Sequence, residues 1–78
     1  MDISIKDLKV GDKGRVSGFG KQSRVYRKRL LAMGLTPGTE FSIVRFAPLG
    51  DPIEITLRGF SLTLRKDEAD ILSIEKVL

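Results

Sequence analysis

Seven basic side chains and no acidic one occur between residues 13 and 39, and they are the clearest chemical signal in this sequence. Such a cluster favours an acidic partner, which can be nucleic acid, an anionic membrane surface or an acidic protein surface. The alternative is a solvated helix face that binds nothing. The seven residues are Lys13, Arg15, Lys21, Arg24, Arg27, Lys28 and Arg29.

The 78-residue chain contains no histidine and no cysteine. It therefore lacks the usual protein ligands of zinc, iron and copper, together with the commonest general base. Its carboxylates leave weak binding of a hard metal ion open. The one acidic cluster, Asp67, Glu68 and Asp70, lacks the spacing and the glycine of a calcium loop. We predict a protein that is not an enzyme and that has no catalytic residue, no cofactor and no metal site.

The apolar pattern predicts one helix and five short strands. Ser23 is the expected N-cap of the helix, and Gly34 is the expected left-handed residue that ends it. Tyr26, Leu30 and Met33 recur at helical spacing and should face the core. The strands are expected at residues 14–19, 41–46, 53–57, 60–65 and 71–77, with a helical turn at 66–70.

These elements should enclose one small core. Ile5 and Leu8 are expected to pack under one end of it, and Phe60, Leu62 and Leu64 should point inward from their strand. Five short strands with glycine turns leave too few residues for two packed sheets. We therefore predict a small α+β fold that is mainly β: a closed, SH3-like five-stranded barrel with a helix inserted after the first strand. It should form a single domain over residues 1–78.

Residues 47–52 are longer and stiffer than an ordinary hairpin turn. Pro48 and Pro52 restrict the backbone, and Gly50 is expected to adopt a conformation that other residues avoid. Asp51 precedes a proline and should be extended, so that its carboxylate can accept hydrogen bonds from nearby N–H groups. The loop is either a rigid hairpin end that protects two sheet edges or a docking tip that presents Leu49.

Ordered motifs across nearly the whole chain resemble the FeoA family, ferrous iron transport protein A. They are DLKVGDKGRV at residues 7–16, R-L-L-x-M-G-L-x-P-G-T at 29–39, APLGDPI at 47–53 and LTLRKDEADIL at 62–72. The resemblance implies an SH3-like barrel with an added helix, and an accessory role beside the membrane ferrous iron transporter FeoB, whose cytosolic part is a GTPase domain. The family is also associated with transition metal ions. Without histidine and cysteine, however, this chain is expected to act by contact and not by carrying iron.

The resemblance and the basic cluster together give one hypothesis: the basic helix docks on the GTPase domain of the transporter and changes its activity or assembly. Charged residues would orient the encounter, while Leu31 and Leu49 would supply apolar anchors. Two alternatives are a nucleic-acid-binding small β-barrel and a basic face that rests on anionic lipid. The predicted partner-binding residues are Arg24, Val25, Arg27, Lys28, Arg29, Leu31, Leu49 and Asp51.

The expected location is cytoplasmic. No apolar run approaches the ~18 residues that span a bilayer. The sequence also starts without the basic segment and apolar core of a signal peptide. The resemblance implies the same location.

Overall fold

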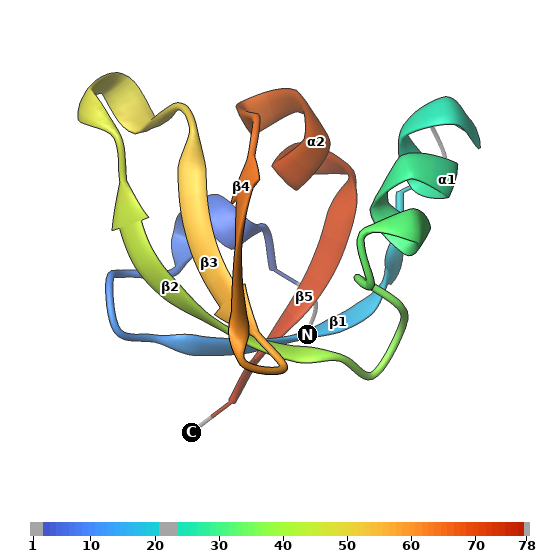
Figure 1. Ribbon diagram of the computed structural model, residues 1–78, viewed down its shortest axis with the longest axis horizontal. Coiled ribbons are helices and arrows are strands. Elements are labelled where there is room, and N and C mark those ends of the chain that lie inside the picture. Colours follow the sequence, from blue (N-terminus) through green and yellow to red (C-terminus); the bar gives the residue numbers. More distant parts are fainter. Residues whose placement is uncertain (1–2, 21–23, 78) are drawn as a thin grey trace.

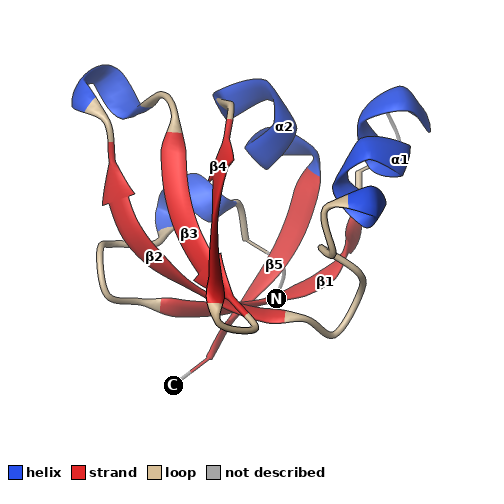
Figure 2. Ribbon diagram, viewed as in Figure 1, coloured by secondary structure: helices blue, strands red, loops and turns tan. Residues whose placement is uncertain are grey.

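The computed structural model describes residues 3–20 and 24–77 (Figure 1). Five strands form one bent sheet in this part of the chain, and the helices lie around it (Figure 2). None of the described helices is long and apolar enough to cross a membrane. The elements in chain order are η1 (Ile5–Asp7), β1 (Lys13–Phe19), α1 (Arg24–Ala32), β2 (Glu40–Phe46), η2 (Pro48–Gly50), β3 (Ile53–Leu57), β4 (Phe60–Leu64), α2 (Lys66–Ile71) and β5 (Leu72–Val77).

The strands form one antiparallel sheet in the order β4-β3-β2-β1-β5. This order and the helix after β1 agree with the predicted SH3-like fold. The predicted closure of the barrel is corrected, because within the described residues no ladder joins β4 to β5. A physical reason lies at the outer edge of β5, where the backbone of Ile3 exchanges hydrogen bonds of 2.7 and 2.9 Å with that of Ile74. The N-terminal segment thus occupies backbone groups that a neighbouring strand would need.

The core fills the concave side of the sheet. The apolar residues of β3 alternate as predicted and are buried, and Ile5 and Leu8 are buried beneath them. Gly14 marks the closest packing, because a Cβ atom there would lie 2.8 Å from Cζ of Phe41 and 2.9 Å from Cγ2 of Ile74. Real Cβ atoms do not approach other atoms so closely, and the core therefore requires glycine in the middle of this sheet.

Helix α1 ends as predicted, with Gly34 at a φ of 95° after its last turn. The predicted N-cap, Ser23, lies outside the described residues. Of the three residues expected to face the core, Leu30 is fully buried and Met33 packs against the core. Tyr26 is only half-buried. The packing of α1 against the core therefore depends mainly on Leu30.

The inward orientation predicted for residues 60–65 holds only at one end of the strand. Leu64 is fully buried and Leu62 packs partly on the core, but 45% of Phe60 is exposed. Phe60 directly follows the tight turn at Arg58 and Gly59, at the tip of an edge strand. Few neighbours reach that tip, so the ring remains in part on the surface.

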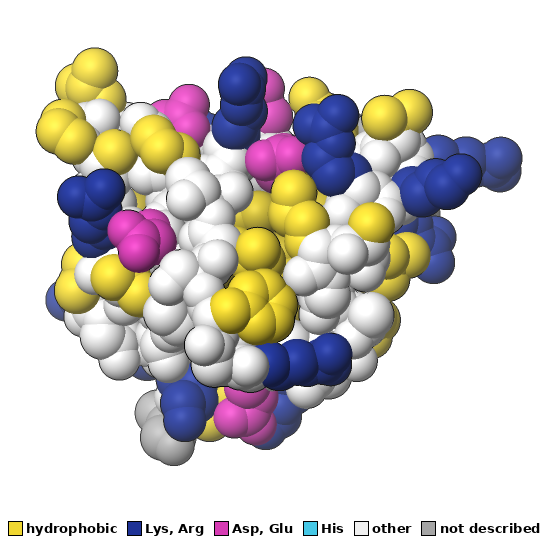
Figure 3. Space-filling view, viewed as in Figure 1, with side chains coloured by type: hydrophobic (Ala, Val, Ile, Leu, Met, Phe, Trp, Pro, Cys, Tyr) yellow, Lys and Arg dark blue, Asp and Glu magenta, His cyan; other side chains and the backbone are white. Residues whose placement is uncertain are grey.

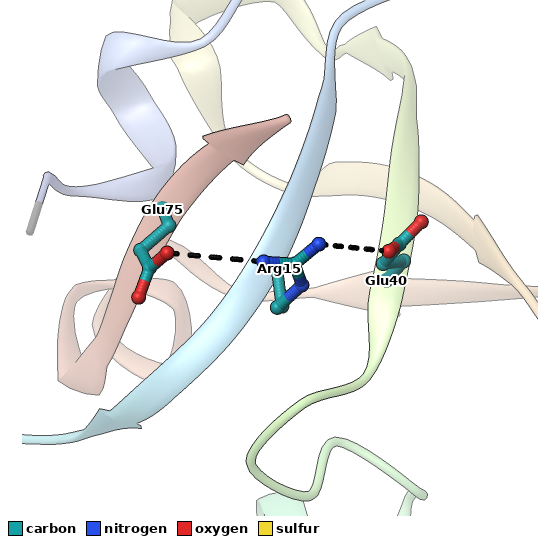
Figure 4. A network of polar contacts seen from close by, with 3 residues as sticks. All are labelled: Arg15, Glu40 and Glu75. Atoms are coloured by element: carbon teal, nitrogen blue, oxygen red, sulfur yellow. Dashed lines mark hydrogen bonds and ion pairs between the residues drawn. The ribbon is translucent and has the colours of Figure 1, made fainter. Parts of the chain in front are cut away.

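On the convex side of the sheet, Arg15 links three adjacent strands (Figure 4). It lies in β1, directly opposite Glu40 of β2 and Glu75 of β5. Its guanidinium nitrogens are 3.1 Å and 3.9 Å from the two carboxylates. All three side chains are exposed, so each ion pair adds at most about 1 kcal/mol. Arg15 is therefore better explained by strand pairing than by partner binding.

Candidate docking surface

Six predicted partner-binding residues lie on α1, and the structure exposes all of them. Val25 is 71% exposed and Leu31 is 37% exposed, so each leaves apolar area on the helix surface. Lysine and arginine side chains gather over α1 at the right of the molecule (Figure 3). We call this set the α1 surface; its members are Arg24, Val25, Arg27, Lys28, Arg29 and Leu31.

Two basic side chains of the α1 surface already have partners within the protein. Nη1 of Arg29 lies 3.3 Å from Oε2 of Glu68, in α2. The guanidinium carbon of Arg27 lies 5.6 Å from the centre of the Phe19 ring, which is the geometry of a cation–π contact. Within the described residues, Arg24 and Lys28 form no ion pair. The charge available to a partner is therefore smaller than the sequence suggests.

Glu68 links the α1 surface to the start of α2. Only 4% of it is exposed, and its two oxygens are used in different directions. Oε1 accepts a 3.0 Å hydrogen bond from the backbone N–H of Arg65, at the start of α2. Oε2 accepts the bond from Arg29. Sequence reasoning missed this role, although a glutamate at the third helical position is a recognised sign of helix capping.

The second predicted region is the loop at residues 47–52. Leu49 is fully exposed and has a φ of 72°, a conformation that costs a non-glycine residue about 1–2 kcal/mol. Gly50 follows with a φ of 80°, as expected for this position. Hydrophobic side chains project over this loop at the upper left of Figure 3. The loop therefore exposes an apolar side chain at a residue whose backbone conformation is unfavourable.

Asp51 holds this loop against α2. Its Oδ1 accepts a 3.1 Å hydrogen bond from the backbone N–H of Lys66, the first residue of α2. The backbone of Asp51 is extended, with a φ of −146°. Both features confirm the predicted capping role. They give Asp51 a structural task that is independent of any partner.

A small hollow of about 280 Å³ lies beside Leu49 and Gly50. Its apolar lining comes from Leu8, Phe46 and Ile53. Three charged residues complete the lining: Lys6, Lys66 and Asp70. We call Leu49 and this hollow the loop surface.

The structure does not bring the two predicted regions together. The loop surface and α1 rise from the same end of the sheet but on opposite sides, with α2 between them (Figure 1). Seven of the eight predicted residues therefore lie on two separate surfaces that face the same end of the molecule, and Asp51 bonds to the start of α2 between them. Within the described ranges, no group of three or more acidic side chains is arranged to hold a metal ion.

The arrangement of these elements defines a class of small SH3-like proteins with an inserted helix, and comparisons with known proteins identify the family. The FeoA domain family matches residues 3–76. The chain therefore belongs to the FeoA family. A relative from Porphyromonas gingivalis, described as "Fe(2+) transport protein A/Fe(2+) transporter FeoB fusion protein", is 33% identical over 78 residues. The match covers 96% of this chain but only 9% of that fusion protein.

Solved structures give the same result. The FeoA-like protein from Clostridium acetobutylicum is 40% identical, with a TM-score of 0.88 over 99% of this chain and 88% of its own. The FeoA protein from Chlorobium tepidum is 36% identical, with a TM-score of 0.86 over 97% of this chain and 71% of its own. A manganese-dependent transcriptional repressor has a TM-score of 0.89 at 12% identity over 37% of its length. That last likeness concerns the fold alone.

Proposed function

We propose that this FeoA-family protein is a non-enzymatic accessory protein of ferrous iron uptake, which acts in the cytoplasm by binding the cytosolic GTPase domain of the FeoB transporter. The observation that carries the proposal is the Porphyromonas gingivalis relative, in which a FeoA-like segment is described as fused to the transporter. A fusion keeps two parts at high effective concentration, which is useful when the parts bind one another.

The geometry supports contact through one end of the molecule. The α1 surface and the loop surface flank α2 at the same end of the sheet, so one broad partner surface can reach both (Figure 1). Each offers an apolar side chain, Leu31 on α1 and Leu49 on the loop. Charged side chains lie near each apolar group. Apolar anchors surrounded by polar residues are the usual composition of a protein–protein interface.

Leu49 is the anchor that the observations favour. A fully exposed leucine contributes nothing to the core, and its positive φ makes it unfavourable in the free protein. Both features are compatible with a side chain that is buried only when the partner is present. Arg24 and Lys28 would add electrostatic attraction that increases the rate of association.

The experiment measures binding of the purified cytosolic part of the FeoB transporter to the immobilised protein, at low and moderate salt. Leu49→Asn tests the loop surface, and the double substitution Arg24→Glu with Lys28→Glu tests the α1 surface without disturbing the Arg29–Glu68 pair. We expect Leu49→Asn to weaken binding about tenfold, the size of effect produced by loss of one interface anchor. The charge reversal should mainly lower the association rate, and less so at higher salt.

Val10→Asn is the matched control, because Val10 is an exposed apolar residue outside both surfaces. It should bind like the native protein. Absence of binding by the native protein, or equal binding by all four proteins, would refute the proposal. Retention of nucleic acid with a steep salt dependence, and not of the transporter, would favour the nucleic-acid alternative.

A further inference from the structure

The outer edge of β4 exposes unpaired backbone groups. β4 pairs with β3 from Phe60 opposite Leu57 to Leu64 opposite Ile53, without a register shift. The two residues that flank a two-residue hairpin turn form a hydrogen-bonded pair, and bonded pairs then recur at every second position. The N–H and C=O groups of Ser61 and Thr63 must therefore point away from β3. No described backbone group bonds to them.

The two edges of the sheet differ in this respect. At β5, Ile3 covers the outer edge through a two-way bridge with the backbone of Ile74. The described part of the chain places no comparable segment on β4. Among the described residues, β4 is therefore the uncovered edge of the sheet.

β4 also lacks the features that usually protect an edge strand, which are an internal charge, a proline or a bulge. Its sequence, FSLTL, contains neither a charged residue nor a proline, and its pairing with β3 is regular. Phe60 and Leu62 leave apolar area beside it, and apolar side chains are visible next to β4 in the middle of Figure 3. This edge can therefore accept a further strand.

We propose that β4 binds an extended segment of a partner protein by strand addition, and that this segment alternates apolar and polar residues and carries an acidic residue at each end. Backbone hydrogen bonds to Ser61 and Thr63 provide the pairing. The apolar residues of the segment lie on the same face as Phe60 and Leu62. The proposal concerns a different surface from the two assigned to the transporter, and it does not depend on them.

The charges at the ends of β4 select this kind of segment. Arg58 precedes the strand, and Arg65 and Lys66 follow it; all three are exposed. An acidic residue near each end of the incoming segment would meet one of these cations. A second copy of this protein is disfavoured, because the antiparallel register that pairs all five residues of β4 places Arg58 opposite Lys66. Like charges directly opposite each other destabilise a strand pair.

The test uses a fluorescent seven-residue peptide with alternating valine and threonine between two terminal aspartates. Its binding to the native protein and to Thr63→Pro is followed by fluorescence anisotropy and by amide NMR. Proline at residue 63 removes an N–H group that faces outward, so the ladder to β3 remains intact. We expect Thr63→Pro to weaken binding about tenfold, and a lysine-ended peptide to bind several-fold more weakly than the aspartate-ended one.

Two further measurements keep the proposal falsifiable if Thr63→Pro folds poorly. A peptide methylated at alternate backbone nitrogens should lose binding to the native protein, and the amides of Ser61 and Thr63 should exchange more slowly when the unmodified peptide is bound. No binding at millimolar peptide, equal binding of both peptides, or NMR changes confined to α1 would overturn the proposal. So would a native dimer that Thr63→Pro abolishes, since a second copy would then occupy this edge.

Discussion

Helix α1 and the loop at residues 47–52 leave the same end of the sheet, but different forces hold them in place. Side-chain contacts hold α1, chiefly those of buried Leu30 and of the Arg29–Glu68 ion pair. Backbone restrictions hold the loop, namely two prolines, two positive φ angles and the bond from Lys66 to Asp51. Substitutions on α1 can therefore change stability and binding together. A substitution at Leu49 should instead weaken binding without lowering stability.

The largest effect is expected at Leu30. Leu30→Ala removes a fully buried side chain and should lower the free energy of unfolding by about 3 kcal/mol. For a chain of this size the total stability is about 4–12 kcal/mol, so the loss should be plain in urea titrations. Leu31→Ala is the matched control and should cost less than about 1 kcal/mol, because Leu31 is exposed. Similar losses at both positions would contradict the orientation of α1.

Charge reversal at Arg29 should have the next largest effect. Arg29→Glu places a second carboxylate beside the buried carboxylate of Glu68, and should lower stability by about 2 kcal/mol. The adjacent substitution Lys28→Glu should change it by less than about 0.5 kcal/mol, since Lys28 is exposed. Thermal unfolding at matched salt compares the two. Equal stability of the two variants would mean that the charge of Arg29 does not stabilise the buried carboxylate of Glu68.

A smaller loss is expected where the loop meets α2. Asp51→Ala removes the acceptor of the Lys66 N–H bond at the start of that helix, and should lower stability by about 1 kcal/mol. Asp70→Ala, near the other end of α2, serves as the control and should be close to neutral. Amide exchange in the first turn of α2 should accelerate only in the Asp51 variant. If amide exchange in the first turn of α2 were unchanged, Asp51 would not stabilise the start of this helix.

The smallest effect has the opposite sign. Leu49→Asn replaces a fully exposed leucine at positive φ with a residue that tolerates this conformation, and should raise stability by about 0.5 kcal/mol. Val10→Asn should bring no such gain, because Val10 is exposed without a positive φ. Chemical denaturation of both variants, measured alongside the binding assay, compares their stabilities with that of the native protein. A Leu49→Asn protein that is less stable than the native protein would show that Leu49 supports the fold.

Much of the fold could be read from local patterns. The alternation in residues 53–57, the stop of α1 at Gly34 and the extended Asp51 depend on interactions within a few residues. The order of strands and helix also followed, because short strands with glycine turns have few compact arrangements. No strand length differed from prediction by more than one residue, and residues 53–57 matched it.

Other features depend on residues far apart in the chain. The Arg29–Glu68 pair joins positions 39 residues apart, and no local pattern distinguishes Arg29 from Arg24 or Lys28. The exposure of Phe60 and the open edge of β4 depend on which segments fail to reach that strand, while Ile3 covers the other edge. Amino-acid types thus dictated the elements and their faces through local geometry. Packing between distant segments decided which charges are already paired and which surfaces remain available to a partner.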